Sequence, residues 1–272
     1  MITPELFTSL IDTYLSEPHA SMVNGIVLGR DLQTTQYFQD ALKRVGLIHI
    51  VVLSGMNITM LSAIFIRLLV PWLGRRIALI ATIFLIAGFI LFVGPEAPAV
   101  RAGIMGCLAL VGIIFGRKTL ALYILFITSV IMVIIYPPWL TSISFQLSFG
   151  ATLGILLFGN SPDKQETNET NKLQSFFLYL FDEMRISLAA QVFTVPIIFW
   201  YFREISWVAP IANILVAWII APLTVLGMIT MIIGTINWQV GFVCSWILYV
   251  LTEYIIRIVR ILAEIPFASM KL

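Results

Sequence analysis

Long apolar runs follow one another through most of this sequence of 272 residues. A run of about 20 apolar residues is long enough to cross a bilayer as a helix. The pattern predicts spans at 48–69, 77–93, 99–116, 119–136, 143–158, 184–202, 207–234 and 239–260. We therefore expect an all-α, polytopic helical membrane protein with about eight transmembrane spans, some of them broken or kinked.

Two segments depart from this pattern. Residues 34–45 predict an amphipathic helix at the membrane surface, because their apolar residues recur at helical spacing. These residues are Phe38, Ala41, Leu42 and Val45. Residues 160–172 (NSPDKQETNETNK) form a polar linker between the front and back spans. We divide the chain into an N-terminal amphipathic, interfacial region, 1–47, and a membrane domain, 48–272.

Segment 207–234 has two interpretations. At ~1.5 Å per residue its length is about 42 Å, against an apolar core of ~30 Å. Pro210 and Pro222 also interrupt it. The segment is either one tilted, kinked span or a pair of half-helices. In the second interpretation every later segment lies on the opposite side of the membrane.

Composition narrows the class of protein further. Hydrophobic residues make up 60% of the chain and charged residues 11%, and the mean hydropathy is +1.01. Ordinary globular domains are ~45–50% apolar and ~25% charged, so a water-soluble domain is excluded. A net charge of +2 excludes a strongly basic nucleic-acid-binding domain as a description of the whole chain. Two histidines and two cysteines are too few for a His-rich metal site or a disulfide scaffold.

The basic residues between spans predict an orientation. Arg75 and Arg76 follow the first span, and Arg117 and Lys118 follow the third, so both loops lie on one side. Lys and Arg mark cytoplasmic loops. We therefore expect these loops in the cytoplasm and both termini outside.

The first span contains a break. Ser54 and Gly55 lie inside its apolar run, with Asn57 just beyond. Glycine relaxes a helix, and Ser54 can cap a new start, so the free N–H groups of a half-helix would suit an anionic ligand. The alternative is a notch of small residues for close helix packing. His49, at the start of this span, is a candidate for a polar path or simply an interfacial or core histidine.

A second motif leads into the third span. Gly94 and Pro98 mark a turn, with Glu96 between them and Arg101 at the head of the span. An arginine is costly in a bilayer. Arg101 therefore extends to the membrane surface, pairs with Glu96, or meets a phosphate, whose oxygens suit the guanidinium fork.

Later spans carry further polar residues and prolines. Such side chains either bond between helices or line a pore, and prolines mark kinks near cavities. They are Gln146, Ser148, Arg185, Pro196, Asn213 and Pro222. The GxxxxGK[ST], HExxH and GxSxG patterns do not occur, so we expect neither an ATP-driven motor nor an enzyme of those protease types, and no cofactor.

Taken together, these motifs resemble the ComEC competence-protein family, the inner-membrane channel of bacterial DNA uptake. The resemblance covers about residues 24–234 and depends on the order and spacing of short motifs. In chain order they are Leu28-Gly29-Arg30, Gly46-Leu47-Ile48-His49, Ser54-Gly55, Gly94, Arg101-Ala102, Phe145-Gln146-Leu147-Ser148, Thr194 with Pro196, and Asn213 with Pro222.

Two departures from the family are visible. The family commonly has histidine where Asn57 stands. Larger members add an extracellular oligonucleotide-binding-type domain and a carboxyl-terminal metallo-β-lactamase-like nuclease domain. We expect neither here, so the resemblance is to the channel domain alone, assigned to 48–272.

The resemblance implies a multi-pass channel that passes single-stranded DNA across the bacterial cytoplasmic (inner) membrane during competence and transformation. Candidate phosphate contacts are Arg101, Arg185, Ser54, Gly55 and Asn57. Candidate polar pore residues are His49, Gln146, Ser148 and Asn213. Candidate hinges are Gly94, Pro98, Pro196 and Pro222.

The expected partners are single-stranded DNA, membrane lipid, and a separate nuclease, DNA receptor and cytoplasmic helicase, with a homo-oligomer left open. Two other classes of function also stay open. One is a small-molecule or lipid-precursor permease, and the other is a non-transporting membrane scaffold of an uptake machinery.

Overall fold

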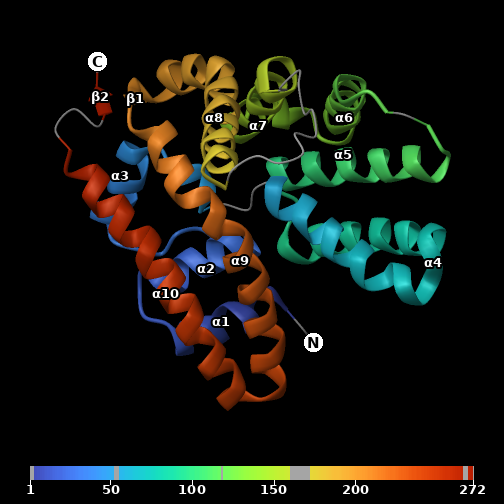
Figure 1. Ribbon diagram of the computed structural model, residues 1–272, viewed down its shortest axis with the longest axis horizontal. Coiled ribbons are helices and arrows are strands. Elements are labelled where there is room, and N and C mark those ends of the chain that lie inside the picture. The colour runs from blue at the N-terminus through green and yellow to red at the C-terminus, as the bar shows by residue number, and fades with distance from the viewer. Residues whose placement is uncertain (1–2, 52–54, 118, 160–171, 266–268, 272) are drawn as a thin grey trace.

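The computed structural model describes residues 3–51, 55–117, 119–159, 172–265 and 269–271, and they are largely helical (Figure 1). The helices are α1 (Pro4–Tyr14), α2 (His19–Leu28), α3 (Gln36–Val45), α4 (Gly55–Val93), α5 (Ala97–Ile114), α6 (Ala121–Ile135), α7 (Ile143–Gly154), α8 (Lys172–Phe202), α9 (Ala209–Ile236) and α10 (Trp238–Ala263). Shorter helical turns cover Ile48–Ile50, Pro137–Thr141 and Ile155–Gly159. A small antiparallel sheet pairs β1 (Glu204–Ser206) with β2 (Ser269–Lys271). The predicted linker 160–172 falls, but for its last residue, outside the described residues.

Helix α2 lies at the centre of one half of the molecule. All ten of its residues are buried. It packs against α1, α9 and α10, and its Met22 and Ile26 join Leu223 of α9 and Ile255 of α10 in one apolar core (Figure 1). The helix ends at Gly29, whose φ of 65° suits a residue without a Cβ. Ten residues span only about 15 Å, so α2 is an internal helix of the core.

The predicted amphipathic helix is present as α3. Its four predicted apolar residues are all buried, and the helix ends at Gly46 with φ 77°. They belong to the same core as Ile255 and Val259 of α10. Protein therefore covers the apolar face of α3, which corrects the expectation that this face rests on the membrane surface.

The spans predicted at 48–69 and 77–93 are joined in α4, which folds into a hairpin (Figure 1). The turn is at Gly74, where φ is 72° and ψ is 162°. Ile58 of the first limb packs with Ile86 of the second and with Ala102 of α5. This second apolar core joins the α4 hairpin to α5.

The described residues contain five helices long and apolar enough to cross a membrane. These are Asn57–Val93, which includes both limbs of the α4 hairpin, Ala97–Ile114, Met184–Tyr201, Ala209–Ile236 and Trp238–Ala263. The predicted count of eight is not confirmed. The run 119–136 yields the 15-residue α6, which stops at Tyr136 because a residue before proline disfavours helix. The run 143–158 divides between the 12-residue α7 and a π-helical turn.

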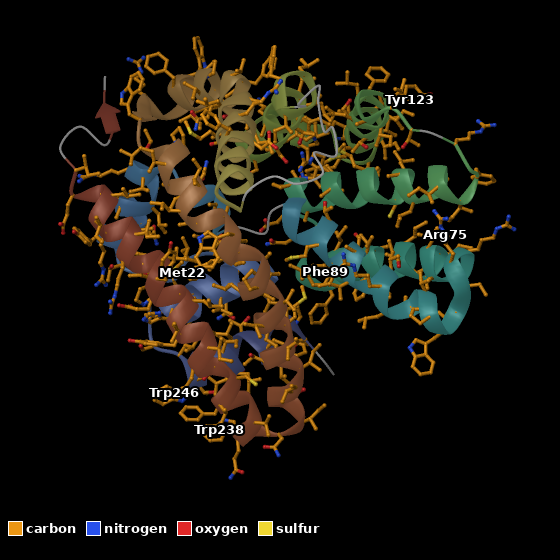
Figure 2. The ribbon with its side chains drawn as sticks, viewed as in Figure 1. Met22, Arg75, Phe89, Tyr123, Trp238 and Trp246 are labelled. Atoms are coloured by element: carbon orange, nitrogen blue, oxygen red, sulfur yellow. The ribbon has the colours of Figure 1, made fainter. Side chains whose placement is uncertain are left out.

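Segment 207–234 is one continuous helix, α9, so the pair of half-helices is excluded. Pro210 lies in its first turn, where no N–H is needed, and the helix runs on through Pro222. Helix α9 packs along α10. Trp238 and Trp246 lie near the end of α10 that follows α9, and Trp238 stacks on Phe242 with ring centres 5.4 Å apart (Figure 2).

The basic loops agree with the predicted orientation in one respect. Arg75 lies at the turn of the α4 hairpin (Figure 2). The connection from α5 to α6, which carries Arg117, is at the same end of these helices (Figure 1).

Candidate functional site

Arg101 is positioned by the turn that begins α5. Gly94 adopts a φ of 122°, which only glycine takes readily, and Glu96 is the last residue before the helix. Pro98 lies in the first turn, where its fixed φ favours helix and its missing N–H costs nothing. Pro98 therefore starts α5 instead of kinking it, and Arg101 follows within the next turn.

The guanidinium of Arg101 lies between α4, α5 and α7. Its Nη1 donates a hydrogen bond of 2.9 Å to the main-chain carbonyl of Ser148. Its Nη2 lies where a Cβ on Gly55 would be, so the absence of a side chain at Gly55 makes room for it. Its Nε is buried and has no hydrogen-bond partner among the residues that the structure describes. The structure thus brings together three of the predicted site residues.

These contacts decide between the interpretations of Arg101. Because Nε is buried and Nη1 bonds to Ser148, the partly buried side chain is held between helices instead of extending freely into solvent. Among the described residues no carboxylate forms an ion pair with it. Glu96 faces Asp31 instead, and burial, followed by that like charge, raises the pKa of the Glu96 carboxyl. Arg101 is a partly buried cation without a described counter-charge.

The local electrostatics favour an anion. Helix α4 begins at Gly55, and the first N–H groups of a helix lack internal partners and carry partial positive charge. A guanidinium beside this helix start places two positive groups together in a region of low dielectric constant. A phosphate would satisfy the unpaired Nε and offset both charges. Ser54, the expected cap, lies outside the described residues.

Asn57 has an anchoring role. Its side chain is 1% exposed, and its Nδ2 donates a 2.8 Å hydrogen bond to the carbonyl of Ile26 in α2. Its Oδ1 is 3.5 Å from the hydroxyl of Thr224 in α9. The side chain therefore ties the start of α4 to α2 and α9, two residues beyond Gly55.

The other predicted residues bond elsewhere. Gln146 Nε2 donates to the carbonyl of Leu140, and Arg185 Nε donates to the carbonyl of Phe158. Asn213 Nδ2 donates to the Ser187 hydroxyl at 3.1 Å, and its buried Oδ1 has no partner in the described part of the chain. The side chain of His49 is outside the described part of the structure, and Pro196 and Pro222 lie inside α8 and α9.

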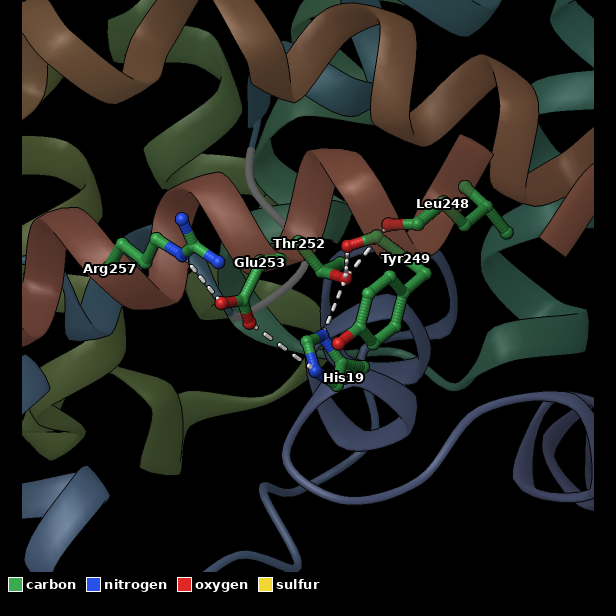
Figure 3. Close-up of polar contacts among 6 residues, drawn as sticks. All are labelled: His19, Leu248, Tyr249, Thr252, Glu253 and Arg257. Atoms are coloured by element: carbon green, nitrogen blue, oxygen red, sulfur yellow. Dashed lines mark hydrogen bonds and ion pairs between the residues drawn. The ribbon is translucent and has the colours of Figure 1, made fainter. Parts of the chain in front are cut away.

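The sequence did not reveal a polar cluster around the buried His19 (Figure 3). His19 Nδ1 is 2.9 Å from the Thr252 hydroxyl, which itself donates to the carbonyl of Leu248. His19 Nε2 is 3.7 Å from Glu253, whose other oxygen bonds to Arg257. Because the hydroxyl proton is directed to the carbonyl, we assign the imidazole proton to Nδ1.

This cluster joins α2 to α10. Burial lowers the pKa of the His19 imidazole, although Glu253 acts in the opposite direction. The only sequence signals were a histidine at the start of an apolar segment and a Glu253–Arg257 pair four residues apart in a predicted span.

Comparisons with known proteins agree with the resemblance seen in the sequence. An uncharacterized protein of Aquifex aeolicus (strain VF5) is 29% identical over 178 residues, which are 65% of this chain and 38% of that protein. ComE operon protein 3 of Bacillus subtilis (strain 168) is 20% identical over 208 residues, or 76% of this chain and 25% of that protein.

The chain thus spans well under half the length of these relatives. No solved structure matches it. The family model described as Competence protein matches residues 26–272, nearly the whole chain. The chain is a membrane protein that belongs to the Competence protein family.

Proposed function

We propose that this chain passes single-stranded DNA across the bacterial cytoplasmic membrane, as a multi-pass channel, during DNA uptake. Family membership supports a role in competence. The observation that carries the finer proposal is the partly buried guanidinium of Arg101, whose buried Nε has neither a hydrogen-bond partner nor a carboxylate partner among the described residues.

A DNA strand must move its phosphates through a region where an unpaired anion is costly. Arg101 offers charged donors there, and Gly55 lets the start of α4 approach the same point. A sparse set of cations is suited to transport, because firm retention of each phosphate would stop the strand. The polar side chains of Gln146 and Asn213 are proposed to provide neutral contacts further along the path.

The proposal includes partners. The protein is proposed to catalyse no reaction itself, so a cytoplasmic helicase would pull the strand, and a separate receptor and nuclease would deliver it. A single chain or a homo-oligomer would enclose the path.

The test uses the whole chain in liposomes. Labelled single-stranded oligonucleotide is added outside, and the label protected from external nuclease is measured. We expect Arg101→Gln to reduce protected label by about 10–100-fold, because a hydrogen bond to a charged group is worth ~1.5–3 kcal/mol. Arg101→Lys keeps the charge and loses the fork, so its uptake should be intermediate.

Arg75→Gln is the matched control, because it removes an exposed arginine at the hairpin turn. Its uptake should equal that of the wild type. Equal uptake by folded Arg101→Gln and the control would refute the site. Stabilisation by a small molecule, with no oligonucleotide entry by the wild type, would favour a permease instead. Absence of any transport with normal assembly, even when a DNA helicase is enclosed in the liposomes, would favour the scaffold.

A further inference from the structure

A cavity of about 560 Å³ opens where α5 ends and α6 begins, away from Arg101. Leu108 and Val111 of α5 and Leu120 before α6 form much of its apolar wall. Arg117 and Thr119, in the connection, contribute polar groups. The cavity therefore has an apolar part and a cationic part.

The backbone at the end of α5 fixes the position of Arg117, the cationic residue of the cavity. Gly116 adopts a φ of 66°, and the N–H of Arg117 bonds to the carbonyl of Gly112 at 2.9 Å. This arrangement is a helix-ending motif that satisfies carbonyls at the end of α5. Gly112 has no side chain, and the methyl group of Thr119 occupies the space where its Cβ would be. The connection is thereby held against α5, with Arg117 at its bend.

The position of Arg117, just beyond the end of α5, corresponds to the membrane interface. The apolar span of α5 ends at Ile114, so Arg117 follows within one turn's length. Phe115 and Leu120 are 73% and 77% exposed, which suits contact with acyl chains. Tyr123 lines the same cavity, and Figure 2 shows it near the start of α6. Tyrosine is enriched at this depth of a membrane protein.

The positive charge of Arg117 has no counter-charge among the described residues. Among the described residues no carboxylate forms an ion pair with its guanidinium. The distribution of basic loops assigns this end of α5 to the cytoplasm, where anionic lipids concentrate, and basic pockets between helices on that side bind lipid headgroups.

We propose that this cavity binds one anionic phospholipid. The lipid phosphate lies against Arg117 and Thr119, and one acyl chain lies along Leu108 and Val111. The site is independent of DNA transport and requires no residue of the Arg101 cluster.

The whole chain is reconstituted in vesicles of equimolar phosphatidylcholine and phosphatidylglycerol. It is then extracted in mild detergent, and retained phosphatidylglycerol is counted by native mass spectrometry. The wild type and the control Arg75→Gln should each retain one molecule. Arg117→Gln should retain about five-fold less, as expected for one cation near a membrane surface. Equal retention by the two arginine variants would overturn the proposal.

A second variant tests the apolar part. Leu108→Trp fills the wall of the cavity and leaves Arg117 in place, so it should also lose the lipid. Unchanged retention in this variant, or displacement of the lipid by soluble glycerol phosphate, would refute a site that includes an acyl chain. Unfolding temperatures in phosphatidylcholine alone should match the wild type and verify that each variant is folded.

Discussion

Replacement of Asn57 by alanine tests how the start of α4 is held in place. Asn57 is buried and donates to the carbonyl of Ile26 near the end of α2. The last carbonyls of a helix lack partners within it. The N–H groups that follow α2 bond to Asn24 and Gly25, so the donor for Ile26 comes from Asn57.

Removal of the Asn57 donor would leave the Ile26 carbonyl without a hydrogen bond. A buried carbonyl left without a donor costs ~1–3 kcal/mol, so Asn57→Ala should lower the free energy of unfolding by about that amount. Asn57→Asp keeps the size of the side chain, removes the donor and adds a buried charge. It should therefore destabilise the protein more than alanine does.

The measurement is unfolding in mild detergent, followed by circular dichroism as denaturant is added. Thr59→Ala is the control, because Thr59 is exposed on the same helix and its hydroxyl donates to the carbonyl of Gly55 within that helix. The control should lie within ~0.5 kcal/mol of the wild type. If Asn57→Ala is as stable as this control, the anchoring role is wrong.

Four further substitutions have defined outcomes. A Cβ on Gly154 would collide with the backbone of Ala189, so Gly154→Ala should lower the free energy of unfolding by about 1–3 kcal/mol. A Cβ on Gly106 would meet no neighbour within 4 Å, so Gly106→Ala should stabilise its helix by up to ~1 kcal/mol. Both variants are measured by the same unfolding assay. Burial lowers the pKa of His19 below its usual 6.5, so the folded state resists protonation. Stability should fall as pH drops from 7 to 5, and melting temperatures should show a smaller fall in His19→Gln; an identical pH profile would contradict this assignment. The Glu96 pKa is raised above its usual 4.5, so charging it costs stability as pH rises, and Glu96→Gln should melt at a higher temperature than the wild type at pH 8 and at the same temperature near pH 4. A constant difference across this range would mean that the charge of Glu96 is not the cause.

Local sequence patterns predicted individual helices well. The spacing of apolar residues in 34–45 identified all four buried positions of α3, and proline and glycine marked where α5 begins. These features depend on neighbours three or four residues away, which the sequence displays directly. The burial of α3 against α10 depends on residues about 200 positions later, and no local pattern reports that.

The same limit applies to the site. Arg101, Gly55 and Ser148 were each singled out by residue type, but their meeting depends on how α4, α5 and α7 pack. The anchoring role of Asn57 was missed because its partner, a carbonyl of α2, belongs to a helix that the sequence did not predict. Residue chemistry thus located the candidates, and tertiary packing assigned their roles.

The location of α2 has a consequence for biosynthesis. Two of the helices that enclose it, α9 and α10, belong to the last part of the chain, and His19 is separated from Thr252 by 233 positions. At ribosomal rates of ~5–20 residues per second, roughly ten to fifty seconds pass between the synthesis of the two. During that interval the amino-terminal helices lack the surfaces that finally enclose them. Nascent chains halted before α9 should therefore leave α2 open to protease or to a chaperone, whereas completed chains should protect it.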